Sequence, residues 1–177
     1  MINRIVQVNI PEVWTFQPCF GSPVSGKKVL QEPFLQNYQK FNSNTGWADN
    51  DTPWPQVMQA LSHFSYHVSF GHFALFDLQG GVHSDSVVLT DPVILSRNKM
   101  YGVTDLGPRG ISSFFSNHVC NEFCSASWMK PADRCRYFRP QAGTSMVGAG
   151  GGGGIGANQH VPTLNHRVGY AVGFRNI

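Results

Sequence analysis

The chain has 177 residues, enough for one domain with a buried core, and 41% of them are hydrophobic, including 13 phenylalanines. The 13 lysines and arginines against 10 aspartates and glutamates give a formal net charge of +3, which is too small and too dispersed to indicate nucleic-acid binding. No apolar run reaches the roughly 18 residues that a membrane span needs, so none is expected.

The start of the chain and its cysteines bear on the compartment. The first residues alternate between apolar and polar side chains up to Pro11, unlike the continuous apolar core of a signal peptide. The four cysteines are unevenly spaced, which fits a reducing compartment better than a disulfide framework; they are Cys19, Cys120, Cys124 and Cys135. We therefore expect an intracellular, cytoplasmic protein.

The first elements in chain order are two predicted strands, RIVQVNI (residues 4–10) and KKVLQEPFL (residues 27–35), the second ended by a proline. The next segment, EPFLQNYQKF, has helical apolar spacing and ends in the turn-rich NSNTG. Its apolar residues are Phe34, Leu35, Tyr38 and Phe41. A short helix is therefore predicted there.

Three further elements follow. WPQVMQALSHF predicts a helix that begins near Pro55, and HVSFGHFALFDL predicts a hairpin with Gly71 near its turn. GPRGISSFFSNH (residues 107–118) predicts a second helix with a proline in its first turn. This mixture of strands and helices indicates an α+β fold class.

The C-terminal stretch is rich in glycine. From Gly148 the sequence reads GAGGGGGIGANQ, which offers no side chains to bury and the largest backbone entropy to lose. No strand leads into this run and no Lys-Ser or Lys-Thr follows it, so it does not fit a phosphate-binding loop. We interpret it as a linker or tail, in which RVGYAVGF could add a short strand.

The segment FFSNHVCNEFC is a candidate metal site. Cys120 and Cys124 are four residues apart and would share one helical face, whereas His118 would point the opposite way. The helix must therefore end or turn near His118 if all three are to bind one ion. Structural zinc takes four ligands in tetrahedral geometry, and the candidates for the fourth are Cys135, Cys19 and His63. The alternative is that the thiols simply fill a core.

Two carboxylates each close an apolar run. Asp77 does so in FALFDLQGG and Asp91 in VVLTDPVI, and either one alone is most simply a turn former. Together they can place oxygens around one magnesium ion, which phosphoryl-transfer sites hold with one or two carboxylates. Asp85, in GVHSDS, is expected to be a solvated loop residue.

Several motifs occur in the order seen in the C-terminal part of the alpha-kinase domain: QALSHFSYH, FDLQG, LTDP, YGVTDLGPRGISSFF and NHVCNEFC. Upstream, VLQEPFLQNYQKFNSNTGW is similar to the segment that joins the two lobes in this family. The chain thus resembles the atypical serine/threonine protein kinases that include myosin-heavy-chain kinases, elongation factor 2 kinase and channel-kinases. The resemblance covers most of the chain between the N-terminal residues and the tail.

The resemblance implies a structural zinc held by His63, His118, Cys120 and Cys124. Such a site would join the hairpin that leads into Asp77 to the end of the following helix, and metal binding would contribute to folding. The other two cysteines would be ordinary thiols.

The resemblance also implies roles in phosphoryl transfer from ATP. Asp77 matches the catalytic aspartate, and Gln79 and Asp91 match magnesium ligands. Glu32 matches the hinge position that contacts adenine. The residues that match polar groups facing the phosphates and the catalytic loop are Lys40 and Asn44.

Two departures from the family concern loops. GVTDLG, from Gly102 to Gly107, resembles the glycine-rich loop beside the peptide substrate but has Thr104 where glycine or alanine is expected. The loop between Asp77 and Asp91 is longer than is usual in the family.

The domain organisation follows from the same resemblance. We expect residues 1–30 to be a remnant of the N-terminal lobe, residues 31–146 the C-terminal lobe, and residues 147–177 a flexible tail. A kinase needs a lysine on an N-terminal-lobe strand, and Lys27 and Lys28 lie too close to the hinge to supply it. We therefore expect most of that lobe to be absent.

Three functions are consistent with these features. The first is an alpha-type protein kinase domain, in fragment, that uses ATP, Mg²⁺ and structural Zn²⁺ to phosphorylate serine or threonine of a protein substrate. The second is a catalytically inactive, zinc-stabilised binding module. The third, a nucleic-acid-binding zinc domain, is disfavoured because DRCRYFR is only a mild basic-aromatic patch.

Overall fold

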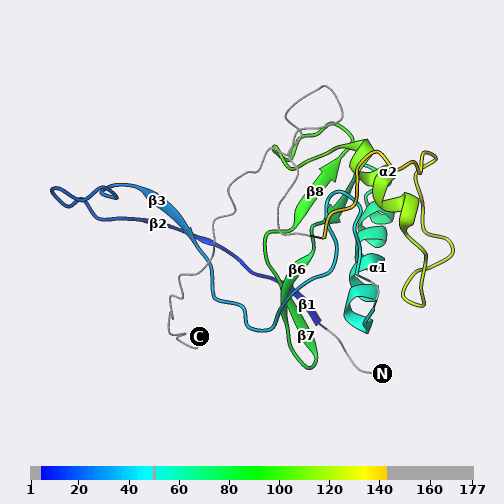
Figure 1. Ribbon diagram of the computed structural model, residues 1–177, viewed down its shortest axis with the longest axis horizontal. Coiled ribbons are helices and arrows are strands. Elements are labelled where there is room, and N and C mark those ends of the chain that lie inside the picture. The colour runs from blue at the N-terminus through cyan, green and yellow to red at the C-terminus, as the bar shows by residue number, and fades with distance from the viewer. Residues whose placement is uncertain (1–4, 50, 143–177) are drawn as a thin grey trace. The chain divides into compact units, whose positions relative to one another are not determined.

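The computed structural model describes residues 5–49 and 51–142 (Figure 1). The chain divides into two compact units. The first contains the residues up to Tyr38 together with Gly80–Thr90, and the second contains Gln39–Gln79 together with the residues from Asp91 onward. The predicted tail, including the strand at RVGYAVGF, lies outside the described residues.

The first unit is built from strands. β1 (Ile5–Val8) pairs in parallel with β7 (Ser86–Leu89), and β7 pairs antiparallel with β6 (Gln79–Val82). The sheet order is β1-β7-β6-β4, and both β6 and β4 (Tyr38–Lys40) run across the boundary between the units.

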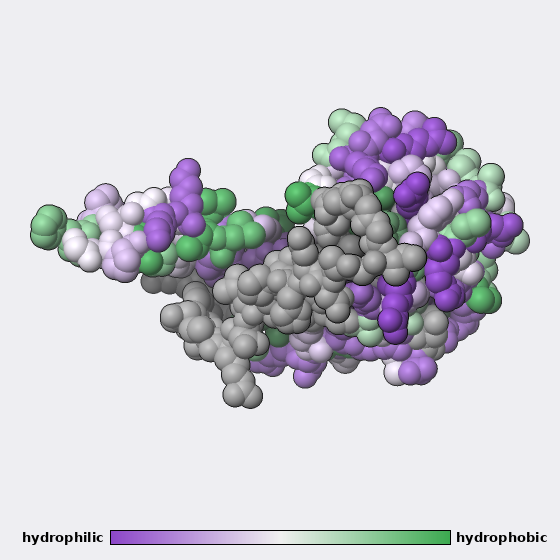
Figure 2. All heavy atoms as spheres, turned by 45° about the horizontal axis from the view of Figure 1, so that its top comes forward, coloured by the Kyte–Doolittle hydropathy of each residue, from purple (hydrophilic) through white to green (hydrophobic). Residues whose placement is uncertain are grey.

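A second, two-stranded sheet also belongs to the first unit. β2 (Glu12–Thr15) pairs antiparallel with β3 (Lys28–Gln31). Apolar side chains lie on its surface, since Val13, Trp14 and Leu30 are 65%, 50% and 60% exposed. Figure 2 shows hydrophobic residues of this ribbon in green. A two-stranded ribbon without a buried face depends mainly on its own pairing for stability.

The second unit packs two helices against a strand pair. α1 (Pro53–Val68) lies against β5 (Phe73–Phe76), and α2 (Pro108–Asn117) lies against β8 (Val93–Ser96), the antiparallel partner of β5. The buried core residues that these elements share include Ala74, Phe76, Leu95, Ile111, Phe114 and Phe115. Aromatic packing is close, since the rings of Phe76 and Phe114 lie 4.9 Å apart in a T-shaped arrangement.

Both predicted helices form, and both have a proline in their first turn, where the missing N–H costs nothing. α1 begins at Pro53, slightly earlier than expected, and continues to Val68. α2 ends at Asn117, and His118 has an extended backbone, with φ −66° and ψ 119°. The predicted end of the helix at His118 is therefore confirmed. Among the described residues, neither helix is long and apolar enough to span a membrane.

Two predictions from periodicity are wrong. The segment expected to be a helix from Phe34 to Phe41 contains β4 instead, because Asn37 adopts a left-handed backbone with φ 51° and the residues after it pair with β6. The hairpin expected around Gly71 is a helix-to-strand turn, since β5 pairs with the distant β8. In addition, β2 was not expected from the sequence.

Gly46 allows the buried loop before α1 to approach α2. Its φ is +92°, and a Cβ placed there would lie 2.9 Å from the backbone carbonyl carbon and oxygen of Ser113. Neither the left-handed conformation nor this distance suits a larger residue. Glycine at this position is thus required by both backbone geometry and packing.

We expect Gly46→Ala to destabilise the protein more than Gly102→Ala does. Gly102 also has a positive φ, +84°, but a Cβ there meets no atom within 4 Å. Both variants incur the left-handed penalty of about 1–2 kcal/mol, and only Gly46→Ala adds a clash with backbone. Thermal unfolding of the two variants measures the difference. Equal melting temperatures would contradict the close approach.

Candidate active site and metal centre

Three residues named from the sequence meet in the second unit. The Lys40 Nζ donates to Asp77 Oδ1 at 2.7 Å, and Gln79 Nε2 donates to Asp77 Oδ2 at 3.2 Å. Lys40 Nζ also lies 3.5 Å from Gln79 Oε1. The side chains of Lys40 and Asp77 are only 8% and 1% exposed. β4, the end of β5 and the start of β6 therefore bring a carboxylate, an amide and an ammonium together out of water.

Two opposing effects set the acidity of Asp77. Burial raises the pKa of its carboxyl above the ordinary value of 3.8, while the hydrogen bond and the charge of Lys40 lower it. The net direction is upward, so burial outweighs the lysine. A carboxylate with a raised pKa is a stronger base than an ordinary aspartate, as general-base catalysis requires.

Asp91 lies at the same end of the β5–β8 pair as Asp77. Phe76 is opposite Val93 in the antiparallel register, and Asp77 follows Phe76 while Asp91 precedes Val93 by two positions. Both aspartates have left-handed backbones, with φ 54° and 47°. The prediction that each carboxylate closes a strand is confirmed, because β5 ends just before Asp77 and β7 shortly before Asp91. Asp91 is exposed, whereas Asp77 is buried.

Asn44 forms a hydrogen bond with the loop from Gly102 to Gly107, which resembles the substrate loop of the family. Its buried side chain donates through Nδ2 to the backbone oxygen of Thr104 at 3.1 Å. In the same loop Gly102 and Gly107 have φ of 84° and 69°. Asn44 thus contacts the glycine-containing loop at Thr104, the residue that departs from the family pattern.

Asp105 organises that loop, and the sequence reasoning did not identify it. Its fully buried carboxylate accepts hydrogen bonds from Ser96 N at 2.9 Å, Ser96 Oγ at 2.6 Å and Gly107 N at 2.9 Å. It therefore fixes both ends of the loop between β8 and α2. The only signal in the sequence was an aspartate before Leu-Gly, which is easily taken for a turn former.

Glu32 belongs to the first unit. Its carboxylate accepts hydrogen bonds from the Thr90 hydroxyl and, at 3.3 Å, from Asn9 Nδ2. Both donors come from the same unit, so the orientation of this carboxylate is fixed within it. Thr90 is also the residue directly before Asp91.

The four residues that the resemblance named as zinc ligands lie together. One ligand atom from each of His63, His118, Cys120 and Cys124 lies within 4.8 Å of all the others. His118 Nε2 is 3.2 Å from His63 Nδ1, 3.9 Å from Cys120 Sγ and 3.8 Å from Cys124 Sγ. A tetrahedral zinc ion with ordinary bond lengths requires edges of about 3.3 Å between two nitrogens and about 3.6 Å between nitrogen and sulfur. The cluster therefore has dimensions that fit the ion.

The histidines are prepared to act as ligands. His63 Nε2 lies 3.0 Å from the backbone oxygen of Met129, which can only accept, so Nε2 carries the proton and Nδ1 presents a lone pair to the cluster. Burial lowers the pKa of His63, and burial together with His63 lowers the pKa of His118 to about 4. Both rings are therefore neutral at neutral pH, as metal ligands must be.

The pKa of the Cys124 thiol shifts in the opposite direction to those of the two histidines. Burial raises the pKa of the Cys124 thiol, and the neighbouring Cys120 adds to this effect. A bound cation would reverse the direction, because thiolate is the ligand form. Cys19 and Cys135 lie outside the cluster and are free thiols, which removes them as candidates for the fourth ligand.

His63 lies on α1, not on a hairpin, so the cluster joins α1 to the segment after α2. This corrects the predicted connection between a hairpin and a helix.

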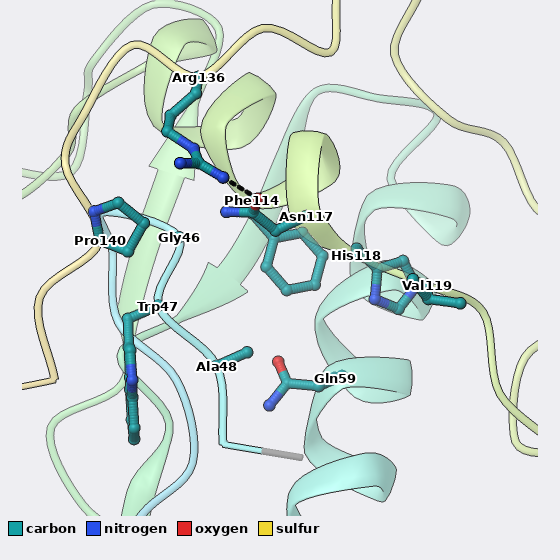
Figure 3. Close-up of a pocket in the computed structure, with 10 residues that line it drawn as sticks. All are labelled: Gly46, Trp47, Ala48, Gln59, Phe114, Asn117, His118, Val119, Arg136 and Pro140. Atoms are coloured by element: carbon teal, nitrogen blue, oxygen red, sulfur yellow. Dashed lines mark hydrogen bonds between the residues drawn. The ribbon is translucent and has the colours of Figure 1, made fainter.

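A pocket of about 290 Å³ lies beside the cluster (Figure 3). Its lining includes His118, Gln59 of α1 and Trp47, and Arg136 Nη2 donates to Asn117 Oδ1 at 2.6 Å at its edge. Its lining does not include Lys40, Asp77 or Gln79.

We expect Lys40→Met to raise the pKa of Asp77 further, because it removes both effects that lower it while burial remains. A raised folded-state pKa means that the stability from this group is complete below the unfolded-state pKa and is lost as pH rises through the folded-state pKa. The variant should therefore lose more stability at neutral than at acidic pH. The loss at neutral pH should be about 3–5 kcal/mol, because the charged carboxylate is left buried without its partner. Urea unfolding at both pH values measures this.

The matched control is Lys28→Met, which removes an exposed lysine from β3. It should change stability little at either pH. An equal, pH-independent loss in both lysine variants would contradict the buried ion pair.

The comparisons with known proteins agree with the motifs. A family model described as the alpha-kinase family matches residues 2–124. Among curated proteins, alpha-protein kinase vwkA of Dictyostelium discoideum is 40% identical over 95 residues, which are 52% of this chain and 15% of that protein. Human eukaryotic elongation factor 2 kinase is 35% identical over 101 residues, 54% of this chain and 13% of that protein. The chain thus spans less than a sixth of the length of these relatives.

Solved structures show the same fold. An alpha kinase from Entamoeba histolytica superposes with a TM-score of 0.60 at 21% identity, covering 82% of this chain and 60% of that one. The alpha-kinase domain of myosin heavy chain kinase A in complex with AMP superposes with a TM-score of 0.53 at 30% identity, covering 67% and 47%. The predicted α+β kinase fold is therefore confirmed, and the chain belongs to the alpha-kinase family.

Proposed function

We propose that this chain carries the catalytic residues of a protein kinase that transfers the γ-phosphate of ATP to a serine or threonine of a protein substrate. The observation that carries the proposal is the buried contact of Lys40, Asp77 and Gln79. Structures of the alpha-kinase domain of myosin heavy chain kinase A in complex with AMP and AMP-PNP support nucleotide binding by relatives. In this proposal residues 31–146 form the C-terminal lobe.

Asp77 is the proposed general base. It takes the proton from the substrate hydroxyl as that oxygen bonds to the γ-phosphorus, and the bond from phosphorus to the β,γ-bridging oxygen breaks to release ADP. Lys40 and Gln79 each occupy one oxygen of the carboxylate, and an ionised carboxylate has further lone pairs for the substrate. Both partners therefore orient Asp77 without blocking it.

The remaining assignments concern the nucleotide. Gln79 and Asp91 would hold Mg²⁺, which would neutralise charge on the phosphates. Their oxygen donors suit this hard cation, and the β5–β8 register supports the assignment by placing Asp91 near the end of β5. Glu32 is the proposed adenine contact, and Asn44 is proposed to support the substrate loop that contains Gly102, Thr104 and Gly107.

We also propose that His63, His118, Cys120 and Cys124 bind a structural zinc ion. The donor set is closed, with four protein ligands, as is typical of structural and not catalytic zinc. The ion would join α1 to the segment after α2, in addition to contacts such as the hydrogen bond from Asn121 Nδ2 to Gln56 O at 2.9 Å. Zinc would therefore add directly to the stability of the second unit.

The kinase proposal predicts transfer of labelled phosphate from Mg-ATP to a generic protein substrate or to the chain itself. Asp77→Asn should lower the rate about 100-fold or more, because it removes the base. Asp85→Asn is the matched control, since it removes an exposed carboxylate from the same stretch of chain. Phosphoamino-acid analysis of the product identifies the acceptor residue.

Transfer that is equal in the parent and in Asp77→Asn would contradict the role of Asp77. A folded, metal-loaded parent without any transfer would contradict kinase activity in this chain. That result would favour the zinc-stabilised binding module.

The zinc proposal predicts a single zinc ion per chain by elemental analysis, which Cys120→Ser and His63→Ala abolish. Cys19→Ser and Cys135→Ser should retain the metal, because both thiols lie outside the cluster. A chelator should lower the melting temperature of the parent and of these two controls, but not of Cys120→Ser. Stoichiometric zinc in the His63→Ala variant would contradict the ligand set.

A further inference from the structure

The backbone N–H and C=O of Leu78, the residue between Asp77 and Gln79, are both held by the two residues that directly follow β4. The Leu78 carbonyl accepts hydrogen bonds from the backbone N–H groups of Phe41 at 2.9 Å and Asn42 at 3.3 Å. The Leu78 N–H donates to the side-chain oxygen of Asn42 at 2.9 Å. One of these contacts is therefore made by a side chain, and it depends on the identity of residue 42.

The Asn42 amide has only one orientation that satisfies its neighbours. Its Nδ2 donates to Gln59 Oε1 at 3.1 Å and to Ser62 Oγ at 2.9 Å. Gln59 Nε2 in turn donates to two backbone carbonyls, of Phe41 at 2.9 Å and of Asp49 at 3.2 Å. Carbonyls only accept and the Leu78 N–H only donates, so each amide is fixed in direction.

This network is completely removed from solvent. Asn42, Gln59 and Ser62 are 0%, 2% and 0% exposed. Buried, fully satisfied polar networks are rigid, because any displacement leaves a donor or acceptor without a partner. Gln59 and Ser62 belong to α1, so the network fixes the Leu78 peptide relative to that helix.

The backbone at Asp77 needs such support. Its φ of 54° lies in the left-handed region, which a residue with a Cβ adopts only when its surroundings impose it. If the Leu78 peptide were released, Asp77 could return to a negative φ. Its carboxylate would then move away from Lys40 Nζ, which is 2.7 Å away in the structure.

We propose that Asn42 is a positioning residue for phosphoryl transfer: it holds the Leu78 peptide and thereby aims Asp77 and Gln79. This inference rests on the proposed function, since it assigns Asp77 as the base. Asn42 does not contact the reacting groups itself. It acts through the backbone between the two residues that do.

The test compares Asn42→Ala with Ser69→Ala in the full chain. Ser69 is the matched control, because it is also buried beside α1 and its hydroxyl accepts from Phe73 N at 3.2 Å, at the start and not the end of β5. Asn42→Ala should lower kcat about 100-fold, as a misplaced catalytic group does. The KM for ATP should change much less than kcat, because Glu32 and Asp91 do not depend on the Leu78 backbone. Ser69→Ala should lose stability but keep kcat.

One readout does not need activity. In Asn42→Ala the Leu78 amide should exchange faster than in the parent, because its acceptor is lost, whereas in Ser69→Ala it should not. Asn42→Asp keeps an oxygen for the Leu78 N–H and should restore part of both kcat and amide protection. A purely structural role would lower kcat no further than Ser69→Ala does.

The outcomes separate the inference from the proposed function. If the parent transfers no phosphate, the proposed function fails, and the hold of Asn42 on the Leu78 backbone is decided by the Leu78 amide exchange. Unchanged Leu78 exchange, or an unchanged kcat in a folded Asn42→Ala variant, overturns the inference. If Asn42→Ala does not fold, Asn42→Leu/Ser62→Ala fills the site with apolar atoms and is subject to the same criteria.

Discussion

Holding a carboxylate out of water is the constraint around which the second unit is arranged. Asp77 is almost fully buried, and an isolated buried charge would cost far more than most single interactions return. Lys40 supplies the opposite charge and Gln79 a further donor, so both oxygens of the carboxylate are used. This arrangement requires β4, the end of β5 and the start of β6 to meet within hydrogen-bonding distance.

α1 connects that arrangement to the candidate metal cluster of His63, His118, Cys120 and Cys124. Ser62 and His63 are consecutive on the helix, and the first belongs to the polar network at Asn42 while the second belongs to the cluster. The other cluster residues follow α2, which packs against β8 beside β5. A change that displaces α1 therefore affects both sites, because Ser62 and His63 occupy adjacent positions of one helix.

The features that the sequence predicts are those with a local signature. Proline in the first turn and apolar periodicity identify both helices, and the spacing of His118 and Cys120 requires the helix to end where it does. The segment after Pro33 was misread because a left-handed Asn37 and pairing with β6 override its helical spacing. The partner of β5 could not be read locally, since β8 is separated from it by two other strands.

The residues that sequence reasoning overlooked share a physical property. Asn42 and Asp105 are buried polar residues whose partners include backbone groups distant in the sequence, Leu78 for Asn42 and Ser96 for Asp105, and such partners leave no pattern around the residue itself. Glycine adopts a left-handed backbone without strain, but Asp77 has a Cβ, so its positive φ persists only because its surroundings impose it. The buried Asn42 side chain is part of those surroundings. Motif similarity locates the proposed reacting groups of this site, whereas the side chains proposed to aim them become visible only from the hydrogen bonds of the folded chain.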